Sequence, residues 1–292
     1  MVETGIVLGC PRSGTTFLMG VLDTVPNTES VTGIIWPAGL CQIVNHPLPD
    51  EVRRAMAVEF ERSLVRYLDS GWYHSRAAAL QKWFKAPTSL GDLIRASKGK
   101  RSLERLIYKE PFLSFCPDFV YEALPEAPIV HIYRDGRDCA NSLVRSYDVL
   151  TDEKLTDLRS TEMRMGRKVD HRYVPWWVAE GGEDAFLSAT PYVRAIWMWK
   201  VMVERCHAFF SRPEVVESGR VLLLRYEDLM RDPLTHGQKV AEHFGMTFGP
   251  RTRKRLEQAH TKSIGKYRKR DRAEVEAAER LAGDALKLYG YV

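Results

Sequence analysis

The chain has 292 residues, of which 45% are hydrophobic and 28% charged, a balance that allows one sizeable core and excludes an intrinsically disordered chain. Its formal net charge of +5 comes from basic residues mixed with acidic ones, which argues against a nucleic-acid partner. The five scattered cysteines include no C-x-x-C pair, so we expect neither a disulfide framework nor a metal site. No apolar run approaches the ~20 residues that cross a bilayer, and the first predicted strand begins almost at Met1, so we expect no transmembrane segment and no secretory signal. These observations together lead us to expect a soluble cytoplasmic protein.

The first predicted elements are a strand, a glycine-rich turn and a helix. A short apolar run precedes the sequence GCPRSGTT at residues 9–16, and Phe17, Leu18 and Leu22 then fall on one helical face. Such a turn binds anions, because exposed backbone N–H groups and the positive end of the helix dipole point at it. A nucleotide-hydrolysing P-loop would carry lysine where Thr15 stands, so the turn suits phosphate without a magnesium triphosphate.

The remaining chain alternates predicted strands with helical patterns. Strands are predicted near residues 5–9, within 29–35, and near 106–109, 129–133 and 221–225. Residues 49–69 repeat an apolar side chain every four positions, and residues 196–210 repeat one every three or four, as amphipathic helices do. This alternation predicts an α/β fold, a three-layer sandwich with a central parallel sheet, in a single domain over residues 1–292.

One segment breaks the alternation. Residues 149–190 are highly charged and then aromatic, with Trp176 and Trp177 before a pair of glycines. Ordinary connections are far shorter, so we predict an insertion that covers the acceptor and carries its own short helices. The alternative is a solvent-exposed loop that is held in place by the packing of its two tryptophans.

Three later segments share their order and spacing with the glycine-rich turn. The sequence YRDGRD at residues 133–138 places Arg134 eight residues before Ser142, the next strand runs into YEDL at Tyr226, and SIGKYR begins at Ser263. Together with P-R-S-G-T-T these segments resemble the sulfotransferases that use 3′-phosphoadenosine 5′-phosphosulfate (PAPS). The resemblance spans most of the chain and implies a metal-free transfer that releases adenosine 3′,5′-bisphosphate (PAP).

The resemblance also implies a role for each motif. The turn would hold the 5′ end of the nucleotide through backbone N–H groups, Arg134 and Ser142 would hold the 3′-phosphate, Tyr226 would lie near the adenine, and the late loop would close over them. The implied cofactor-binding residues are Arg12, Ser13, Gly14, Thr15, Thr16, Arg134, Ser142, Tyr226, Ser263, Gly265 and Lys266. A guanidinium fork suits a terminal phosphate. The structural alternative for Arg134 is an ion pair with Asp135 or Asp138, and that for Tyr226 is core packing.

The catalytic residues are less completely specified. Arg12 and Lys109 would balance charge on the bridging oxygen, since Lys109 ends a strand in a K-[DES]-P pattern that resembles several sulfotransferase branches. The early family glutamate has no counterpart at the expected spacing. Glu110 is therefore the first candidate for the general base, His46 the second and Glu29 the third.

Two other functions stay open beside the sulfotransferase: a P-loop small-molecule kinase and a non-catalytic bisphosphate-binding protein. The missing loop lysine and the pairing of Arg134 with Ser142 argue against the kinase. The acceptor would be a hydroxyl or amine on a small molecule, carbohydrate or lipid. Six aromatic residues predict an apolar or aromatic cleft for it: Trp36, Trp72, Tyr73, Trp83, Trp176 and Trp177.

Overall fold

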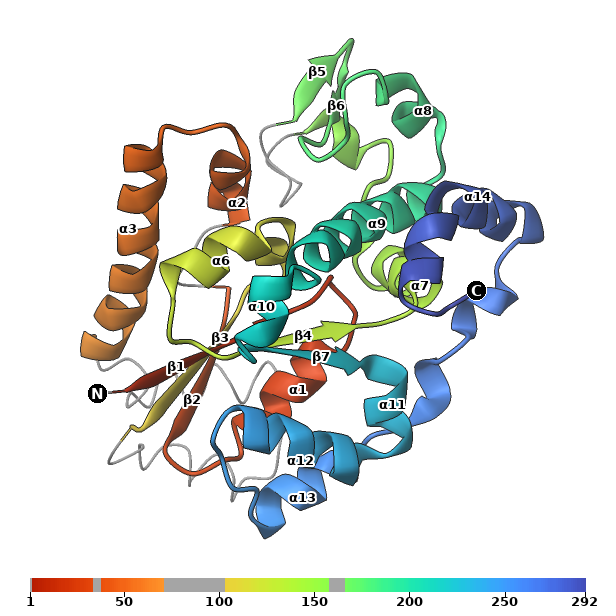
Figure 1. The fold of residues 1–292 in the computed structure, drawn as a ribbon. Coiled ribbons are helices and arrows are strands. Elements are labelled where there is room, and N and C mark those ends of the chain that lie inside the picture. The colour runs from red at the N-terminus through yellow and green to blue at the C-terminus, as the bar shows by residue number, and fades with distance from the viewer. Residues whose placement is uncertain (1, 34–37, 71–102, 158–165) are drawn as a thin grey trace.

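The fold is centred on a sheet of five parallel strands. A computed structural model describes residues 2–33, 38–70, 103–157 and 166–292 (Figure 1). Across the sheet the order is β2-β3-β1-β4-β7. The strands are β1 (Glu3–Leu8), β2 (Thr28–Thr32), β3 (Arg105–Lys109), β4 (Ile129–Tyr133) and β7 (Val221–Arg225). The predicted parallel sheet is thus confirmed, with all five predicted strands within a few residues of their expected positions.

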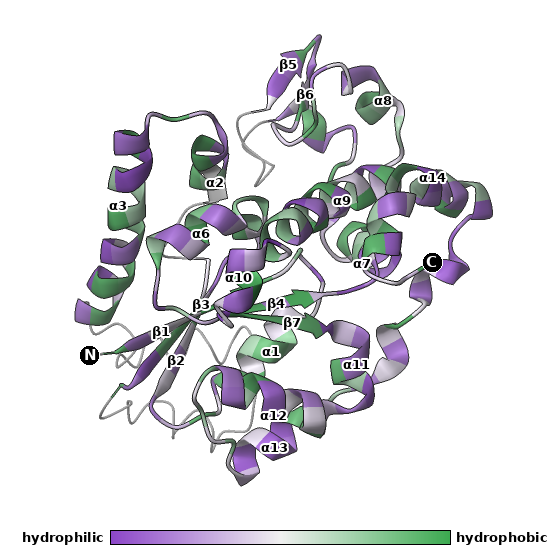
Figure 2. Ribbon diagram, in the orientation of Figure 1, coloured by the Kyte–Doolittle hydropathy of each residue, from purple (hydrophilic) through white to green (hydrophobic). Residues whose placement is uncertain are grey.

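Helices cover both faces of the sheet, as the α/β prediction requires. In β1, Ile6 and Leu8 pack into one core and Val7 into the other, because successive strand side chains point to opposite faces. Figure 2 shows the helices with hydrophobic and hydrophilic residues alternating along them. One layer contains α1 (Thr15–Leu22), α11 (Tyr226–Arg231), α12 (Pro233–His243) and α13 (Pro250–Leu256). The other contains α2 (Ala38–Asn45), α3 (Asp50–Asp69), α6 (Pro117–Ala123), α7 (Gly136–Tyr147), α9 (Pro191–Phe210), α10 (Pro213–Glu217) and α14 (Arg272–Leu288).

Local signals set the ends of several helices. The Asp232 side chain accepts from Thr235 N at 3.2 Å and caps α12, and Gly245 beyond its end has φ +60°. In α9 the predicted stripe is buried core, with Trp199 fully enclosed. The stripe predicted in α3 is buried only in part, because Val52 at its start lies 44% exposed.

The predicted insertion has a fold of its own. It contains the 3-10 turn η3 (Lys154–Thr156), the antiparallel hairpin of β5 (Arg167–Val169) and β6 (Arg172–Val174), and α8 (Glu183–Ser188), above α9 in Figure 1. The short helices were expected and the hairpin was not. Residues 158–165 lie outside the described part of the chain.

The sheet order places the loops of interest together. In the sheet, β3 and β2 lie on one side of β1 and β4 and β7 lie on the other, so the loops after β1 and β4 leave the same edge of the sheet side by side. In open α/β sheets, ligands bind beyond the carboxyl ends of the strands at such a point. The glycine-rich turn follows β1 there, and Arg134 follows β4.

Candidate active site

The glycine-rich turn is a tightly closed loop between β1 and α1. Both donors of Ser13, its N–H and its hydroxyl, bond to Cys10 O at 3.0 and 2.7 Å. Gly14 has φ +99°, and a Cβ placed there would lie 2.3 Å from the Tyr226 ring. Ser13 therefore closes the turn instead of offering the N–H predicted for a ligand, and only glycine fits the next position.

The open donors of this turn come from the start of α1. No described carbonyl or side chain accepts from the N–H groups of Gly14, Thr15 or Thr16. The first N–H groups of a helix have no partner within it, and the helix dipole adds positive potential at the same point. These three unpartnered groups, called the anion cradle here, are available to an anion, the ligand that the sequence predicts for this turn.

The side chain of Arg12 turns toward α7. It has φ +74°, and its Nε donates to Ser142 Oγ at 2.9 Å while Nη1 donates to Tyr147 OH at 3.2 Å. Its guanidinium also lies 5.2 Å from the centre of the Tyr147 ring. Arg12 therefore contacts the residue predicted for the 3′-phosphate.

Arg134 lies buried between two loops. Its Nη1 donates to Arg12 O at 3.0 Å and its Nη2 to Ser263 O at 2.7 Å, while the guanidinium lies 4.5 Å from the centre of the Tyr226 ring. The alternative ion pair with Asp138 exists, at 3.7 Å. Arg134 Nε is buried and has no partner among the described residues. Buried donors are normally paired, so this Nε is a donor that a ligand held between the two loops could use.

The late loop contains the 3-10 turns η4 (Thr261–Ser263) and η5 (Lys266–Lys269), and it docks onto α7. Asp138 accepts from Gly265 N at 2.6 Å and from Tyr267 N at 3.1 Å, and Tyr226 OH bonds to Ser263 Oγ at 2.8 Å. Burial raises the pKa of the Asp138 carboxyl, and the two N–H groups and Arg134 oppose that rise. Asp138 thus anchors the loop, a role that sequence analysis missed because it considered this residue only as an ion-pair partner.

Lys109 ends β3 beside the first turn of α1. Its side chain is almost fully buried, and Nζ lies 3.5 Å from Thr16 Oγ1. Burial lowers the pKa of this lysine, as does the charge of Arg12, whereas the neighbouring Glu110 raises it. The lysine predicted to balance charge therefore lies next to the anion cradle.

Glu110 immediately precedes the 3-10 helix η2 (Pro111–Phe115) and is also buried. Its Oε1 accepts from Phe112 N at 3.1 Å and so caps η2. Ser114 on η2 in turn accepts from Gly9 N at 2.9 Å, which ties η2 to the entry of the glycine-rich turn. Ser114 is a second residue that sequence analysis missed, because the bond spans 105 positions.

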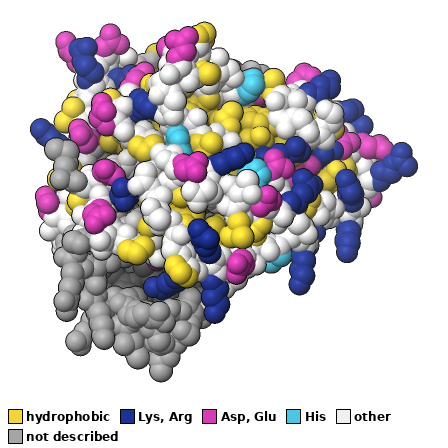
Figure 3. Space-filling view, turned by 60° about the horizontal axis from the view of Figure 1, so that its bottom comes forward, with side chains coloured by type: hydrophobic (Ala, Val, Ile, Leu, Met, Phe, Trp, Pro, Cys, Tyr) yellow, Lys and Arg dark blue, Asp and Glu magenta, His cyan; other side chains and the backbone are white. Residues whose placement is uncertain are grey.

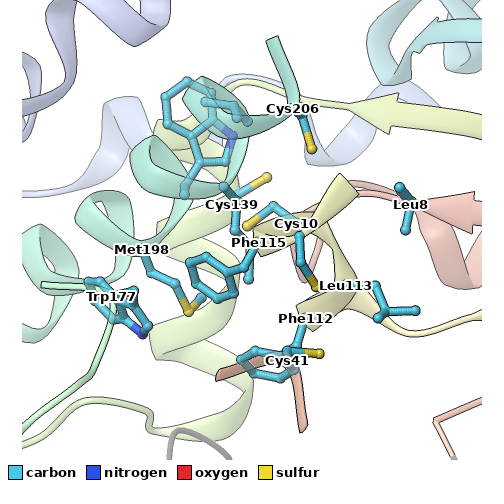
Figure 4. Close-up of a cluster of buried hydrophobic side chains, with 14 of the residues drawn as sticks. Leu8, Cys10, Cys41, Phe112, Leu113, Phe115, Cys139, Trp177, Met198 and Cys206 are labelled. Atoms are coloured by element: carbon cyan, nitrogen blue, oxygen red, sulfur yellow. The ribbon is translucent and has the colours of Figure 1, made fainter. Parts of the chain in front are cut away.

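The side chains around η2 form a sulfur-rich cluster. Figure 4 shows Phe112, Leu113 and Phe115 packed among residues of β1, α2, α7 and α9. Trp176 and Trp177 of the insertion contact Phe115, at ring distances of 4.9 and 6.3 Å. The insertion therefore touches the element that follows Glu110. The other four aromatic residues predicted for a cleft, Trp36, Trp72, Tyr73 and Trp83, lie outside the described residues.

The other two candidates for the base lie elsewhere. His46 is exposed at the end of α2, with its ring 3.4 Å from Gln42 Nε2, and no described contact joins it to Lys109. Glu29 pairs in register with Leu106 at the far end of β3 from Lys109, and it accepts from Tyr67 OH at 3.0 Å. Of the three candidates, only Glu110 lies beside the lysine.

The parallel sheet with helices on both faces defines an α/β protein, with a glycine-rich turn between its first strand and first helix. The sequence model of the Sulfotransferase family matches residues 6–188, more than half of the chain, so this chain belongs to that family. A comparison with curated proteins found no match.

Solved structures of sulfotransferases align with this chain at low sequence identity. Sulfotransferase STF9 from Mycobacterium avium is 14% identical, with 100% of this chain and 78% of that chain covered and a TM-score of 0.49. The sulfotransferase domain of the Synechococcus PCC 7002 olefin synthase is 19% identical, with 96% and 95% covered and a TM-score of 0.46. Family membership rests on the family model.

The described residues contain no group of three or more His, Cys, Asp or Glu residues that could hold a metal ion. None of the helices in the described part of the chain is long and apolar enough to cross a membrane.

Proposed function

We propose that this protein is a PAPS-dependent sulfotransferase that transfers a sulfuryl group in line to a hydroxyl or amine of a small-molecule, carbohydrate or lipid acceptor. The observation that carries the proposal is Arg134, a buried arginine with an unpartnered Nε, held between the loop of residues 9–16 and the late loop. Arg12 connects it to Ser142. Cations and hydroxyls gathered at the end of β4 suit a terminal phosphate dianion.

The described residues fit the two ends of the nucleotide. The N–H groups of Gly14, Thr15 and Thr16 would hold the 5′-phosphosulfate, and Arg134, Ser142 and Lys266 the 3′-phosphate. Arg12 belongs with the 3′ group in this proposal, because its side chain contacts Ser142. Tyr226 would border the adenine. Ser263 and Gly265 would shape the loop over the adenine, because Ser263 bonds to Tyr226 and Gly265 bonds to Asp138.

The chemistry needs charge balance and a proton acceptor. When bound, PAPS supplies the sulfuryl group and its phosphate is the leaving group. Lys109 then neutralises charge on the bridging oxygen, supported by its place beside Thr16. Glu110 takes the proton that the acceptor loses, supported by its burial next to Lys109. His46 stays a second candidate for this step without structural support.

The wider setting belongs to the same proposal. Residues 1–292 form one sulfotransferase domain, and residues 149–190 cover the acceptor, supported by the contacts of Trp176 and Trp177 with Phe115 beside Glu110. A cytoplasmic location agrees with five cysteines that are all free and buried.

The first test is nucleotide binding without metal. PAP at about one hundred times its dissociation constant should stabilise the protein by ~2.7 kcal/mol, a rise of a few degrees in melting temperature. Stabilisation by ATP–Mg and none by PAP would refute the proposal and favour the kinase. The acceptor is then identified by incubating the protein with PAPS and panels of hydroxyl and amine acceptors and measuring added sulfate by mass spectrometry. PAP binding without transfer to any acceptor would favour the non-catalytic alternative.

The second test separates the two phosphate ends. Arg134→Ala should weaken PAP binding more than tenfold, the effect of losing one charge-assisted hydrogen bond of ~1.5–3 kcal/mol, and should spare adenosine 5′-monophosphate. Arg220→Ala is the matched control, because Arg220 also donates to backbone carbonyls, lies over a tyrosine ring and has a buried unpartnered Nε. Arg220 precedes β7 at the opposite edge of the sheet, so this variant should bind both nucleotides normally. Equal losses for both nucleotides in Arg134→Ala would make Arg134 structural.

A further inference from the structure

The positive charge of this protein is concentrated in one segment. Residues 251–272, called the basic strip here, contain ten Lys or Arg and two Asp or Glu, so the strip carries +8 by ten minus two, against +5 for the whole chain. The strip comprises α13, the late loop and the start of α14. Figure 3 shows Lys and Arg side chains gathered toward its right-hand side, the side on which α14 lies in Figure 1.

Charges in the strip are mostly unneutralised. The side chains of Lys262, Lys266 and Lys269 are exposed, and none of them forms an ion pair with any residue that the structure describes. Long-range potential comes from such uncompensated charges, whereas paired ones cancel at a distance. The strip therefore projects a positive field into solvent.

The strip also runs into the proposed nucleotide site. Ser263 accepts from Arg134, and the N–H groups of Gly265 and Tyr267 bond to Asp138. Farther back, Arg255 lies over the ring of Phe17, the residue that follows the anion cradle. Lys262 and Lys269 thus flank the residues that build the site, although no described contact connects either of them to Arg134.

We propose that the basic strip guides the anionic nucleotide to its site and raises its rate of association, with Lys262 and Lys269 acting from outside the site. This inference rests on the proposed function. Two phosphomonoesters carry about −3 to −4 at neutral pH, so PAP responds strongly to such a field. Charges at the rim of a site change association rates and salt dependence more than they change dissociation rates.

The test compares two matched double variants. Lys262→Glu with Lys269→Glu reverses two charges in the strip, and Arg54→Glu with Arg62→Glu reverses two exposed charges on α3, at the opposite side of the molecule in Figure 1. PAP association is followed by stopped-flow tryptophan fluorescence. The strip variant should associate about 3- to 10-fold more slowly at low ionic strength, with its dissociation rate unchanged within about twofold, and the α3 variant should match the parent protein.

Salt provides the second arm. At about 0.5 M NaCl the screening length falls to a few ångströms, so the parent and the strip variant should converge. Equal slowing in both double variants, or unchanged association in the strip variant, would overturn the inference while leaving PAP binding and the proposed function intact. Absence of PAP binding in the parent protein would refute both. Binding of phosphatidylserine vesicles that depends on Lys262 and Lys269, without any effect on PAP association, would assign the strip to a membrane surface and also overturn the inference.

Discussion

Arg194→Met should detach the insertion from α9. The Arg194 side chain is 1% exposed and donates to the carbonyls of Leu150, Phe186 and Leu187 at 2.5–2.9 Å, and to Asp152 Oδ1 at 2.8 Å. These partners lie at the two ends of the insertion, so one guanidinium holds both. Methionine keeps the bulk of the side chain and removes every donor.

The size of the loss follows from the partners left behind. Three buried carbonyls each lose a hydrogen bond from the guanidinium at about 1 kcal/mol or more, although Phe186 O keeps Ala189 N as a donor and Leu187 O keeps Arg172. The exposed Asp152 carboxylate returns to water at little cost. We expect a loss of about 3–5 kcal/mol, or roughly 5–8 °C in melting temperature for a chain of this length. Differential scanning calorimetry measures the loss, and limited proteolysis should cut within residues 150–190.

Arg172 provides the control. It contacts the same Leu187 carbonyl at 3.2 Å and Asp152 at 3.6 Å, but from a side chain that is 28% exposed. Arg172→Met should therefore cost less than about 1 kcal/mol. Equal stability and equal proteolysis for the two variants, with PAP binding retained, would refute the assignment of Arg194 as the anchor of the insertion.

Three further outcomes are expected. Gly14→Ala should abolish PAP binding in calorimetric titration and destabilise the protein by about 2 kcal/mol, because the alanine Cβ would meet the Tyr226 ring at a left-handed φ. Gly249→Ala is the control and should do neither, because the space around residue 249 is open. Lys109→Met should lower kcat by ~10²-fold or more and leave PAP affinity within about threefold in the same titration, and a matching loss of affinity would contradict its place at the transition state. Burial lowers the pKa of His131 to about 3, so the unfolded state takes up a proton near pH 6.5 and the native state only near pH 3. The free energy of unfolding should therefore fall as pH drops from 6.5 towards 3, by about 2 kcal/mol at pH 5 in urea titrations. His131→Phe should make the free energy of unfolding less dependent on pH over this range. An equal dependence in the two proteins would contradict the reasoning.

The sheet and the glycine-rich turn between β1 and α1 could be predicted from sequence because their signals are local. An apolar strand, a glycine that must adopt positive φ, and a helix start all lie within residues 3–22. The hairpin of β5 and β6 has only three residues in each strand, too few for a period of two to register. Its existence depends on packing against the rest of the insertion.

The parts of the site that escaped prediction depend on distant contacts. Arg12 turns toward Ser142 across 130 positions, and Asp138 meets Gly265 across 127. Such pairings are decided by how α7 and the late loop cross in space. Glu110, the first candidate for the base from sequence, is by contrast held by a local bond from Phe112 N, two positions away.

The cysteine cluster around η2 gives the protein an internal reporter of its own opening. All five thiols are free and at most 2% exposed, and burial raises the pKa of Cys10, Cys139 and Cys206, which keeps these three in the unreactive thiol form. A thiol reagent should therefore leave the native molecule unlabelled and modify it only as fast as the structure opens. Because the five positions lie on different elements, from the turn after β1 to α9, the order in which they are labelled would map which parts of the sulfotransferase core open together.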